Sequence, residues 1–399
     1  MLLLAGCSEH GKTPPPDAAI PDAAPDAFVP LFLPPTLIPL APGSRPYFLC
    51  VADFDFDGWD DIAVISRVNA TLSVLVNKTT PGEATPRFAP PVVLPIGLDA
   101  TQAVAADFNG DGRVDLAVNN PSQSTVSVLL NTTPLEQEPT ASFASRVEFS
   151  TGSSPVTVAA GDVDGDGKPD LAVGSFGEAP APGSVAVLLD RTPVGASTPM
   201  FTPMVAVPGG LGVRDVAVVD IDGDGKRDLV TVSSGSSSVM VLVNTTLANP
   251  TAASFVVRGP FSTGSQPLAV VAGSFRGGLN ADLAVASSGA SVISILENTT
   301  LAPGAVTFLP SDDRGVGFGP QTLALGSLFG RPFVASANLG SDTISVLHGP
   351  DLDIRADLPV GMQVRSIVVG DFNRDGKADV ALVGATADAI GVMMGSRSF

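Results

Sequence analysis

Residues 161–173 read GDVDGDGKPDLAV, and near-copies of this stretch recur along the whole chain. The stretch places carboxylates at alternate positions, Asp162, Asp164 and Asp166, and follows them with a glycine. A further carboxylate, Asp170, comes three residues after that glycine. Calcium accepts about six to eight oxygens in flexible geometry, and a D-x-D-x-D-G run offers them with glycine at the sharp bend. The stretch predicts a calcium-binding loop.

Seven copies of one unit make up the chain from about residue 28 onward. The first loop position recurs at intervals of 44 to 58 residues, and such a period is typical of propellers or solenoids. The seven first positions are Asp53, Asp107, Asp162, Asp220, Ser274, Ser327 and Asp371.

Each unit contains four short apolar runs separated by turn residues. In the second unit they are residues 104–106, 116–118, 126–130 and a run with a Phe at 149–155. Runs of this length, rich in Val, Leu and Ile, are strands rather than helices. Four antiparallel strands repeated seven times predict an all-β fold, a seven-bladed β-propeller.

The two ends of the chain predict how the ring closes. The last unit stops after its third run, residues 390–394, whereas a spare run, residues 31–40, precedes the first unit. We expect the spare run to be the outer strand of the last blade, where proline is tolerated because an edge strand need not donate every N–H. Deletion of residues 28–40 is then expected to lower global stability.

Five loops have a complete ligand set. Side chains at positions 1, 3, 5 and 9 of each loop are the candidate ligands, and the residue at position 7 would offer its backbone carbonyl. About five Ca²⁺ ions are expected. The predicted sites are Asp53, Asp55, Asp57, Trp59 and Asp61; Asp107, Asn109, Asp111, Arg113 and Asp115; Asp162, Asp164, Asp166, Lys168 and Asp170; Asp220, Asp222, Asp224, Lys226 and Asp228; and Asp371, Asn373, Asp375, Lys377 and Asp379.

Two units have lost this set. In the fifth unit Ser274, Arg276 and Gly278 replace three ligands although Asp282 persists, so that the guanidinium can take the place of the ion. The sixth unit has a shorter loop that contains Arg331 and no carboxylate. We expect neither loop to bind metal.

The repeated loops carry a family resemblance. An EF-hand would need a bidentate Glu at position 12 and flanking helices, but position 12 is apolar here, as in Val173. The loops, the Phe-x-x-Gly-x-x-Pro runs and the period resemble FG-GAP/VCBS repeats of integrin-α-like propellers, over about residues 30–399. This resemblance implies that the ions brace the hairpin between the first and second strands, and that partners meet the opposite face.

The start of the chain predicts an anchor. Residues 1–7, ending in Leu-Ala-Gly-Cys7, resemble part of the lipobox of bacterial lipoproteins, in which the cysteine carries the lipid. Residues 8–27 are rich in Pro, Asp and Ala and predict a disordered tether before the propeller of residues 28–399. We expect lipid anchoring in the cell envelope, at the outer membrane or cell surface, with secretion as the alternative, and contact with the membrane only through the lipid.

Composition bounds the function. The formal net charge of -19 excludes a nucleic-acid binder, because no Lys/Arg cluster exists to follow phosphates. One His outside the tether, His348, and no nucleophile motif argue against an enzyme. A calcium-dependent hydrolase or lyase with an acidic site in the central channel stays the alternative, because propellers host such enzymes.

The expected function is binding of a protein or glycan partner at the cell surface by a monomer in which calcium is mainly structural. Partner-binding candidates are Arg67, Asn69 and Arg214, together with the insert at residues 174–184, at the end opposite the loops. Asn-x-Thr triplets end the third strand-like run in four units, and we interpret them as turn formers rather than glycosylation sites. They begin at Asn77, Asn131, Asn244 and Asn298.

Overall fold

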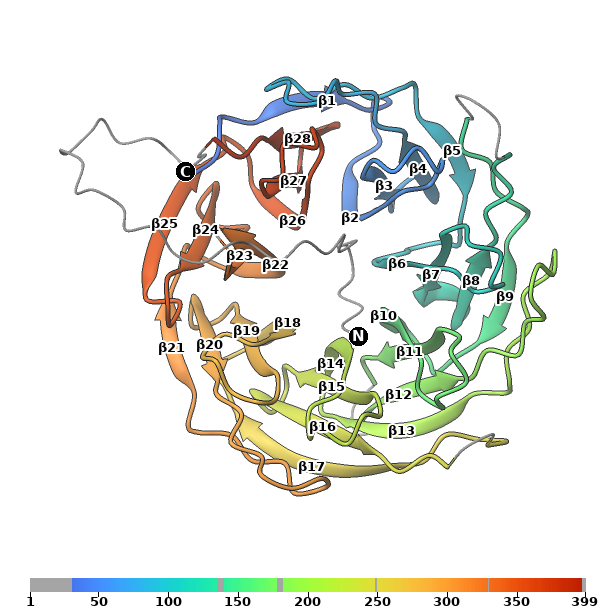
Figure 1. The fold of residues 1–399 in the computed structure, drawn as a ribbon, viewed down its shortest axis with the longest axis vertical. Coiled ribbons are helices and arrows are strands. Elements are labelled where there is room, and N and C mark those ends of the chain that lie inside the picture. Colours follow the sequence, from blue (N-terminus) through green and yellow to red (C-terminus); the bar gives the residue numbers. More distant parts are fainter. Residues whose placement is uncertain (1–30, 135–139, 178–181, 248–249, 329, 397–399) are drawn as a thin grey trace, which may run out of the picture.

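The computed structural model describes residues 31–134, 140–177, 182–247, 250–328 and 330–396. These residues form seven four-stranded antiparallel sheets arranged around a central axis (Figure 1). The seven-bladed propeller expected from the repeats is confirmed. We number the blades along the chain, so that blade 1 contains β2 to β5 and blade 7 contains β26, β27, β28 and β1.

The innermost strand of each blade is built from the run before each loop. Small apolar side chains fill this position in blade 2 (AVAA), where the blades converge on the axis, whereas blade 1 places Tyr47 and Phe48 there. The innermost strands are β2 (Pro46–Ala52), β6 (Ala103–Ala106), β10 (Pro155–Gly161), β14 (Val213–Val219), β18 (Pro267–Gly273), β22 (Pro320–Leu328) and β26 (Val364–Gly370).

The second strand of each blade begins directly after the loop. Six of the seven are buried along their whole length, since they lie between neighbouring blades, and near-continuous apolar runs suit that position. The second strands are β3 (Asp61–Ser66), β7 (Asp115–Asn120), β11 (Asp170–Ser175), β15 (Asp228–Ser233), β19 (Asp282–Ser287), β23 (Arg331–Asn338) and β27 (Asp379–Gly384).

The third and fourth strands complete each blade, and one 3-10 turn, η1 (Pro121–Gln123), precedes β8. The third strands are β4 (Thr71–Leu75), β8 (Thr125–Leu129), β12 (Gly183–Leu188), β16 (Ser238–Asn244), β20 (Val292–Leu296), β24 (Thr343–His348) and β28 (Ala389–Met393). The fourth strands are β5 (Val92–Pro95), β9 (Val147–Ser150), β13 (Val205–Gly210), β17 (Phe255–Ser262), β21 (Asp312–Gly315), β25 (Ile354–Pro359) and β1 (Thr36–Pro39).

The spare N-terminal run closes the ring, as predicted. Strand β1 pairs antiparallel with β28, with Ile38 opposite Ile390 and Pro39 opposite Ala389. An additional bridge joins Phe32 to Gly395. Residues from both ends of the described chain therefore share the last sheet, and β1 is shorter than the run that predicted it.

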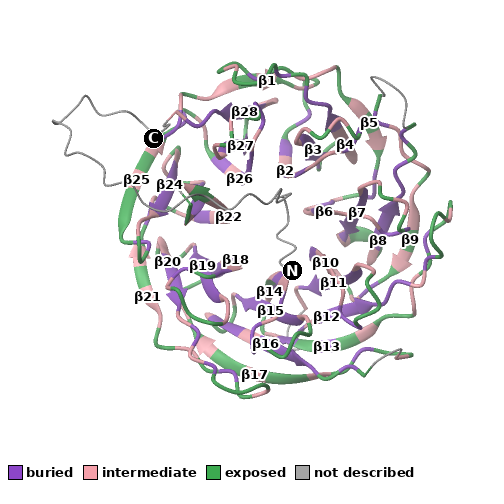
Figure 2. Cartoon of the chain, in the orientation of Figure 1, coloured by how far each residue is buried: buried purple, intermediate pink, exposed green. Residues whose placement is uncertain are grey.

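The core lies between the blades. Seven clusters of buried side chains each span two adjacent blades, so the core is itself a ring. Figure 2 shows the buried middle strands enclosed by outer strands, such as β17 and β25, that are largely exposed. Burial of apolar surface stabilises the fold by about 25 cal/mol per Å². Because each cluster is shared by two blades, each blade depends for its stability on both neighbours.

Candidate functional site

The five complete loops share one backbone conformation. In the third loop the N–H of Gly167 donates to Asp162 Oδ2 at 2.9 Å, and the N–H groups of Asp166 and Lys168 donate to the side chains two residues earlier. These three bonds, from positions 6, 5 and 7 to side chains at positions 1, 3 and 5, recur in the other four loops. One folding pattern therefore serves all five loops.

Two positions in each loop have left-handed backbone. The glycine at position 6 has φ between +77° and +87° in all five loops, which L side chains rarely adopt. Position 4 is left-handed as well, and there the chain places Phe56, with φ +66°, and Arg374, with φ +49°. The sequence reasoning identified the first bend but missed the second, because position 4 has no constant residue type.

Three of the loops gather three carboxylates, whose oxygens lie within 4.8 Å of one another. Oxygen-rich groups of this kind can hold a hard divalent cation. In the second and fifth loops asparagine occupies position 3, and the position-5 carboxylates pair with Arg113 at 2.8 Å and Lys377 at 2.9 Å. The three clusters are Asp53, Asp55 and Asp57; Asp162, Asp164 and Asp170; and Asp220, Asp222 and Asp228.

Basic side chains contact two of the three clusters. Lys78 Nζ lies 3.1 Å from Asp55 Oδ2 and 3.3 Å from Asp57 Oδ2. Arg191 reaches Asp164 Oδ2 at 2.6 Å and an oxygen of Asp166 at 3.3 Å. A bound cation would compete with these side chains for the same oxygens, because both need the negative charge that the clusters supply.

The aspartate at position 9 has a second role, which we call the latch. Its Oδ2 accepts the N–H of position 2, and its Oδ1 accepts an N–H from a residue at the end of the third strand or two residues beyond it. In the first loop Asp61 accepts from Phe54 at 2.9 Å and from Asn77 at 2.7 Å. The same pair of bonds is made by Asp115, Asp170, Asp228, Asp282 and Asp379.

Burial perturbs the latch carboxyl groups of the complete loops. The pKa of Asp61 and of Asp170 is raised to about 8, chiefly by burial; the two N–H donors lower it in part, and neighbouring loop carboxylates raise it. The pKa of Asp115, Asp228 and Asp379 is raised to about 7 for the same reasons. A divalent cation in the loop would favour the ionised form of these groups.

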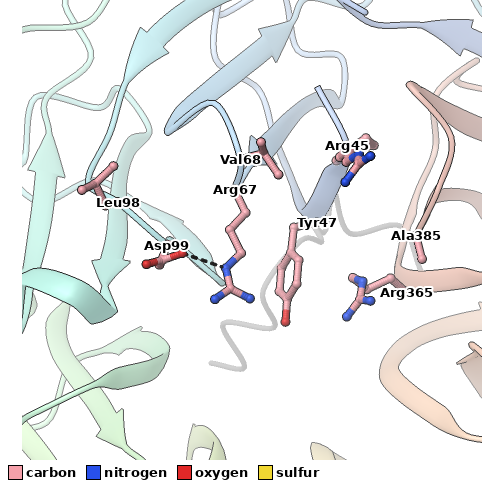
Figure 3. Close-up of a pocket in the computed structure, with 9 residues that line it drawn as sticks. Arg45, Tyr47, Arg67, Val68, Leu98, Asp99, Arg365 and Ala385 are labelled. Atoms are coloured by element: carbon pink, nitrogen blue, oxygen red, sulfur yellow. Dashed lines mark ion pairs between the residues drawn. The ribbon is translucent and has the colours of Figure 1, made fainter. Parts of the chain in front are cut away.

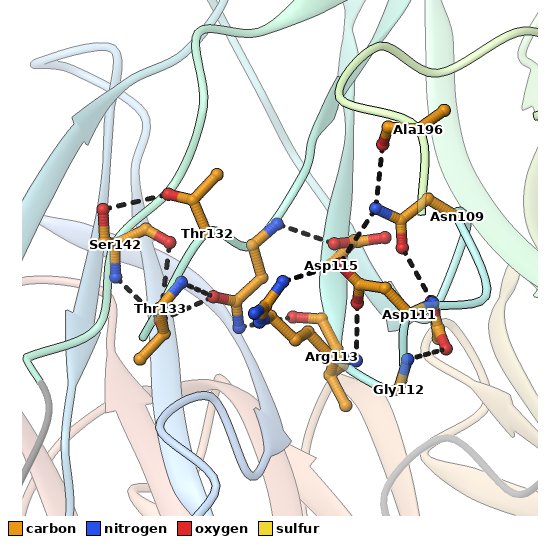
Figure 4. A network of polar contacts seen from close by, with 12 residues as sticks. Asn109, Asp111, Gly112, Arg113, Asp115, Thr132, Thr133, Ser142 and Ala196 are labelled. Atoms are coloured by element: carbon orange, nitrogen blue, oxygen red, sulfur yellow. Dashed lines mark hydrogen bonds and ion pairs between the residues drawn. The ribbon is translucent and has the colours of Figure 1, made fainter. Parts of the chain in front are cut away.

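The Asn-x-Thr triplets join neighbouring blades rather than merely forming turns. Asn131 Nδ2 donates to the carbonyl of Phe54, in the loop of blade 1, at 2.9 Å. Its Oδ1 accepts the N–H of Thr133, which is labelled in Figure 4. Asn77, Asn244 and Asn298 donate in the same way to the loop of the preceding blade. We call this contact the clasp. All four asparagines are buried, which excludes them as glycosylation sites.

Blade 3 has a different residue at the clasp position. Asp190 replaces the asparagine, is fully buried, and accepts the N–H of Thr192. Its Oδ2 is buried and has no hydrogen-bond partner among the described residues. Burial raises the pKa of this carboxyl group. The change from Asn to Asp at this position was the only sign of the difference in the sequence.

The fifth and sixth units lack the complete ligand set, but the guanidinium of Arg276 does not take the place of the ion, contrary to expectation. Arg276 pairs with Glu297 at 3.3 Å and with Asp312, so its guanidinium engages the outer strands of blade 5 and not the remaining loop carboxylate, Asp282. In blade 6 the pairing of β22 with β23 continues to Leu328 and Arg331, so only two residues separate the strands where the other blades have a loop.

The end of the propeller opposite the loops has two hollows. A lateral pocket of about 390 Å³ lies between blades 7, 1 and 2, and Arg67 lines it. An axial pocket of about 340 Å³ is lined by the starts of the innermost strands, and Arg214 lies there on β14. Asn69 is exposed in the turn between β3 and β4 and lines neither pocket. Two of the three candidate partner-binding residues thus lie in pockets, and sequence reasoning missed Arg45, Tyr47 and Arg365.

One acidic side chain, Asp215, lines the axial pocket. Its Oδ1 accepts the hydroxyl of Thr157 and its Oδ2 accepts the N–H of Val270, each at 3.0 Å, so it connects blades 3, 4 and 5. Burial raises its pKa to about 6. These contacts make Asp215 a structural group between blades.

The predicted lipobox with Cys7 and the tether lie outside the described residues, as do residues 178–181 of the insert. Among the residues that the structure covers, no helix has the length and apolar character needed to cross a membrane.

Comparison with known proteins agrees with the repeats and the ring. The FG-GAP-like repeat family matches residues 53–118 and 107–173, that is, the first three loops. No curated protein matches the chain at a significant level.

Similar solved structures include BBS1N in complex with ARL6DN, soaked with lead, with a TM-score of 0.61 and 11% identity over 92% of this chain and 98% of that chain. The mercury-soaked form has a TM-score of 0.57 and 12% identity over the same shares. Hydrazine synthase of Kuenenia stuttgartiensis has a TM-score of 0.56 and 16% identity over 88% of this chain and 96% of that chain. At such identities the likeness concerns the fold alone. The chain is therefore a seven-bladed β-propeller that carries FG-GAP-like repeats.

Proposed function

We propose that the chain is a calcium-stabilised binding module of the cell envelope, which holds a protein or glycan partner at the end opposite its metal loops. The observation that carries this proposal is the difference between the two ends. Carboxylate clusters occupy one end, whereas arginine and tyrosine side chains line the pockets at the other. One end suits structural cations and the other suits a partner.

Calcium is the ion that the loops suit best. Their donors are carboxylate and amide oxygens, which calcium prefers, and the shared hydrogen-bond pattern supports about five equivalent sites rather than three. Each loop lies at the connection between two strands of a blade, so the ions act as structural braces. Extracellular calcium modules bind at about 0.1 to 1 mM, which suits a location outside the cell.

The anchor completes the proposal. A lipid on Cys7 and the flexible segment of residues 8–27 would hold the propeller at the outer membrane or cell surface as a monomer. Labelling of intact cells with palmitate, followed by mass spectrometry of the N-terminal peptide, tests the lipid. An unmodified Cys7 in the mature protein would contradict it.

The alternative of a calcium-dependent hydrolase or lyase gains no support from two groups that such an enzyme could use, Asp215 and Cys50. Asp215 in the axial pocket is held by neighbouring blades. Burial raises the pKa of the Cys50 thiol to about 12, which keeps it from acting as a nucleophile. Turnover of a hydrolase or lyase substrate with calcium, and none without it, would favour the alternative.

Affinity capture tests the binding function. The chain is immobilised in calcium-containing buffer and exposed to a cell-surface extract, and captured partners are identified by mass spectrometry. We expect the double variant Arg67→Glu and Arg214→Glu to lose capture, because it reverses two charges at the pocket end. The control is Arg331→Glu, which reverses an exposed charge on blade 6. Equal capture by all three proteins would contradict the proposed face.

A further inference from the structure

The lateral pocket concentrates positive charge in a strongly acidic chain. Arg45, Arg67 and Arg365 line it together with one carboxylate, Asp99. Arg67 Nε lies 3.4 Å from Asp99 Oδ1, and both side chains are close to half exposed, at 42% and 49%. Such an exposed contact holds little energy. Arg45 and Arg365 have no ion pair among the described residues.

Two of these arginines are fixed by an aromatic ring. The guanidinium carbon of Arg67 lies 5.4 Å from the centre of the Tyr47 ring, and that of Arg365 lies 4.7 Å from it. Figure 3 shows Tyr47 between the two guanidinium groups. Stacking on the ring limits the freedom of both side chains before any ligand arrives. Preorganised donors of this kind lose less entropy on binding.

The rim of the same pocket is aliphatic. Val68 is 65% exposed and Leu98 is 60% exposed, on either side of Arg67 in the pocket wall (Figure 3). Arginine, tyrosine and exposed aliphatic side chains around one hollow are typical of the energetic centre of a protein–protein interface.

Carboxylates are the anions that best match this arrangement in a peptide. A guanidinium group offers parallel N–H donors in a planar fork, which a carboxylate accepts in a bidentate manner. A sugar would instead need an open aromatic face for its ring, and the two flanking guanidinium groups cover Tyr47. The geometry therefore favours an acidic peptide over an acidic glycan.

We infer that the lateral pocket binds an acidic peptide segment of the partner, with a Glu or Asp carboxylate held by Arg45 and Arg365 and an adjacent aliphatic side chain against Val68 and Leu98. The inference rests on the proposed binding function and narrows its partner class from protein or glycan to protein. The carboxylate also competes with Asp99 for Arg67.

Fluorescence anisotropy with a defined probe tests this inference. The probe is the fluorescein-labelled peptide Gly-Leu-Glu-Leu-Glu-Gly, titrated with the full chain in calcium buffer at low and high salt. We expect binding that weakens with salt. The Glu-to-Gln version of the peptide is expected to bind at least about tenfold more weakly, because charge-assisted hydrogen bonds are lost.

Variants assign the binding to the pocket. Arg365→Gln is expected to weaken probe binding about tenfold, and Arg45→Gln, at an exposed side chain, serves as a second variant should the first disturb folding. Arg331→Gln is the matched control and is expected to leave binding unchanged. Thermal melts establish that each variant is folded.

The inference would be overturned by no binding of the probe, by equal binding of the Glu and Gln peptides, or by retention of full affinity in both pocket variants. Tighter binding of oligogalacturonate than of the probe would reassign the pocket to acidic glycans and would also overturn it. Capture of a surface partner that depends on Arg67 and Arg214, without probe binding, would leave the proposed function standing. Probe binding without any such capture would leave only the pocket assignment standing.

Discussion

Blades 4 and 5 are neighbours that differ in their acidic loops. Blade 4 has a complete acidic loop, with Asp220, Asp222 and Asp228 drawn together, whereas blade 5 has Ser274 and Arg276 in place of the first ligands. The two blades nevertheless share the latch and the clasp.

The comparison separates two tasks of the loop. In blade 5 the N–H groups of Phe275 and Asn298 donate to Asp282 at 3.0 and 2.8 Å, although the other predicted ligands are gone. A buried carboxylate that satisfies two backbone donors is costly to lose on its own account. The latch thus stabilises the blade without a cation, and in the complete loops the same aspartate is also a candidate cation ligand.

Calcium removal has the largest expected effect on this comparison, because it acts on the complete loops only. At 10 mM calcium a site with a dissociation constant of about 1 mM stabilises the fold by about 1.4 kcal/mol, so five such sites contribute about 7 kcal/mol. Urea unfolding with calcium and with EDTA measures the difference, and calorimetric titration counts the ions. Equal stability in both buffers would contradict the cation sites, and a count of three would restrict them to the all-aspartate loops.

Removal of the latch in each blade has the next largest effect. Asp282→Ala leaves two buried N–H groups without an acceptor, at a cost of about 1 to 3 kcal/mol each, and we expect the same loss in calcium and in EDTA. Asp228→Ala should lose more in calcium than in EDTA, because it removes a ligand as well. Asp313→Ala, at an exposed position of β21, is the control. A calcium-dependent loss in Asp282→Ala would show that blade 5 binds an ion after all.

A pH series sharpens the contrast between the two tasks. The raised pKa values of Asp61, Asp170 and Asp228 mean that the folded, calcium-depleted protein keeps protons that the unfolded chain has released. Its free energy of unfolding therefore falls as pH rises from about 4 to about 8. Calcium needs the ionised groups, so its stabilising increment grows over the same window. Thermal melts from pH 5 to pH 8 measure it, and a constant increment would contradict the expectation.

The smallest effect concerns the clasp of blade 3. Asp190→Asn would give the buried Oδ2 position an amide that can donate, as the asparagines of blades 4 and 5 do, and should raise stability by about 1 kcal/mol. Asn244→Asp in blade 4 is the reciprocal change and should lower stability. Urea unfolding of both variants at pH 8 is the measurement. Destabilisation by Asp190→Asn would show that Asp190 serves another contact.

The repeated elements were predictable because their signals are local. The loop spacing, the four apolar runs and the spare run at residues 31–40 determined the number of blades, the strand order and the closure by β1. The loops and runs depend on residues close together in the sequence, and seven copies reinforce a pattern that one copy would leave weak. The closure followed from counting the runs, because one is missing at one end of the chain and one is spare at the other.

The contacts between blades were not predictable in the same way. The carbonyl that Asn131 reaches belongs to a residue 77 positions away, and Arg45, Tyr47 and Arg365 meet only after the ring has closed. The recurrence of Asn-x-Thr at one place in four units was a signal of a shared role, and the turn interpretation captured only its bond to Thr133 and its equivalents.

Because β1 pairs with β28, the ring can close only after residues 389–393 have been synthesised. Residues 36–39 leave the ribosome first among the described strands, and they find their partner only when residues 389–393 have followed. Until translation ends, the nascent chain exposes an unpaired edge at each end of its growing arc. A chain that terminates before β28 would keep both edges unpaired. Such shortened products should be recognised by proteases and chaperones, whereas chains that include β28 escape them.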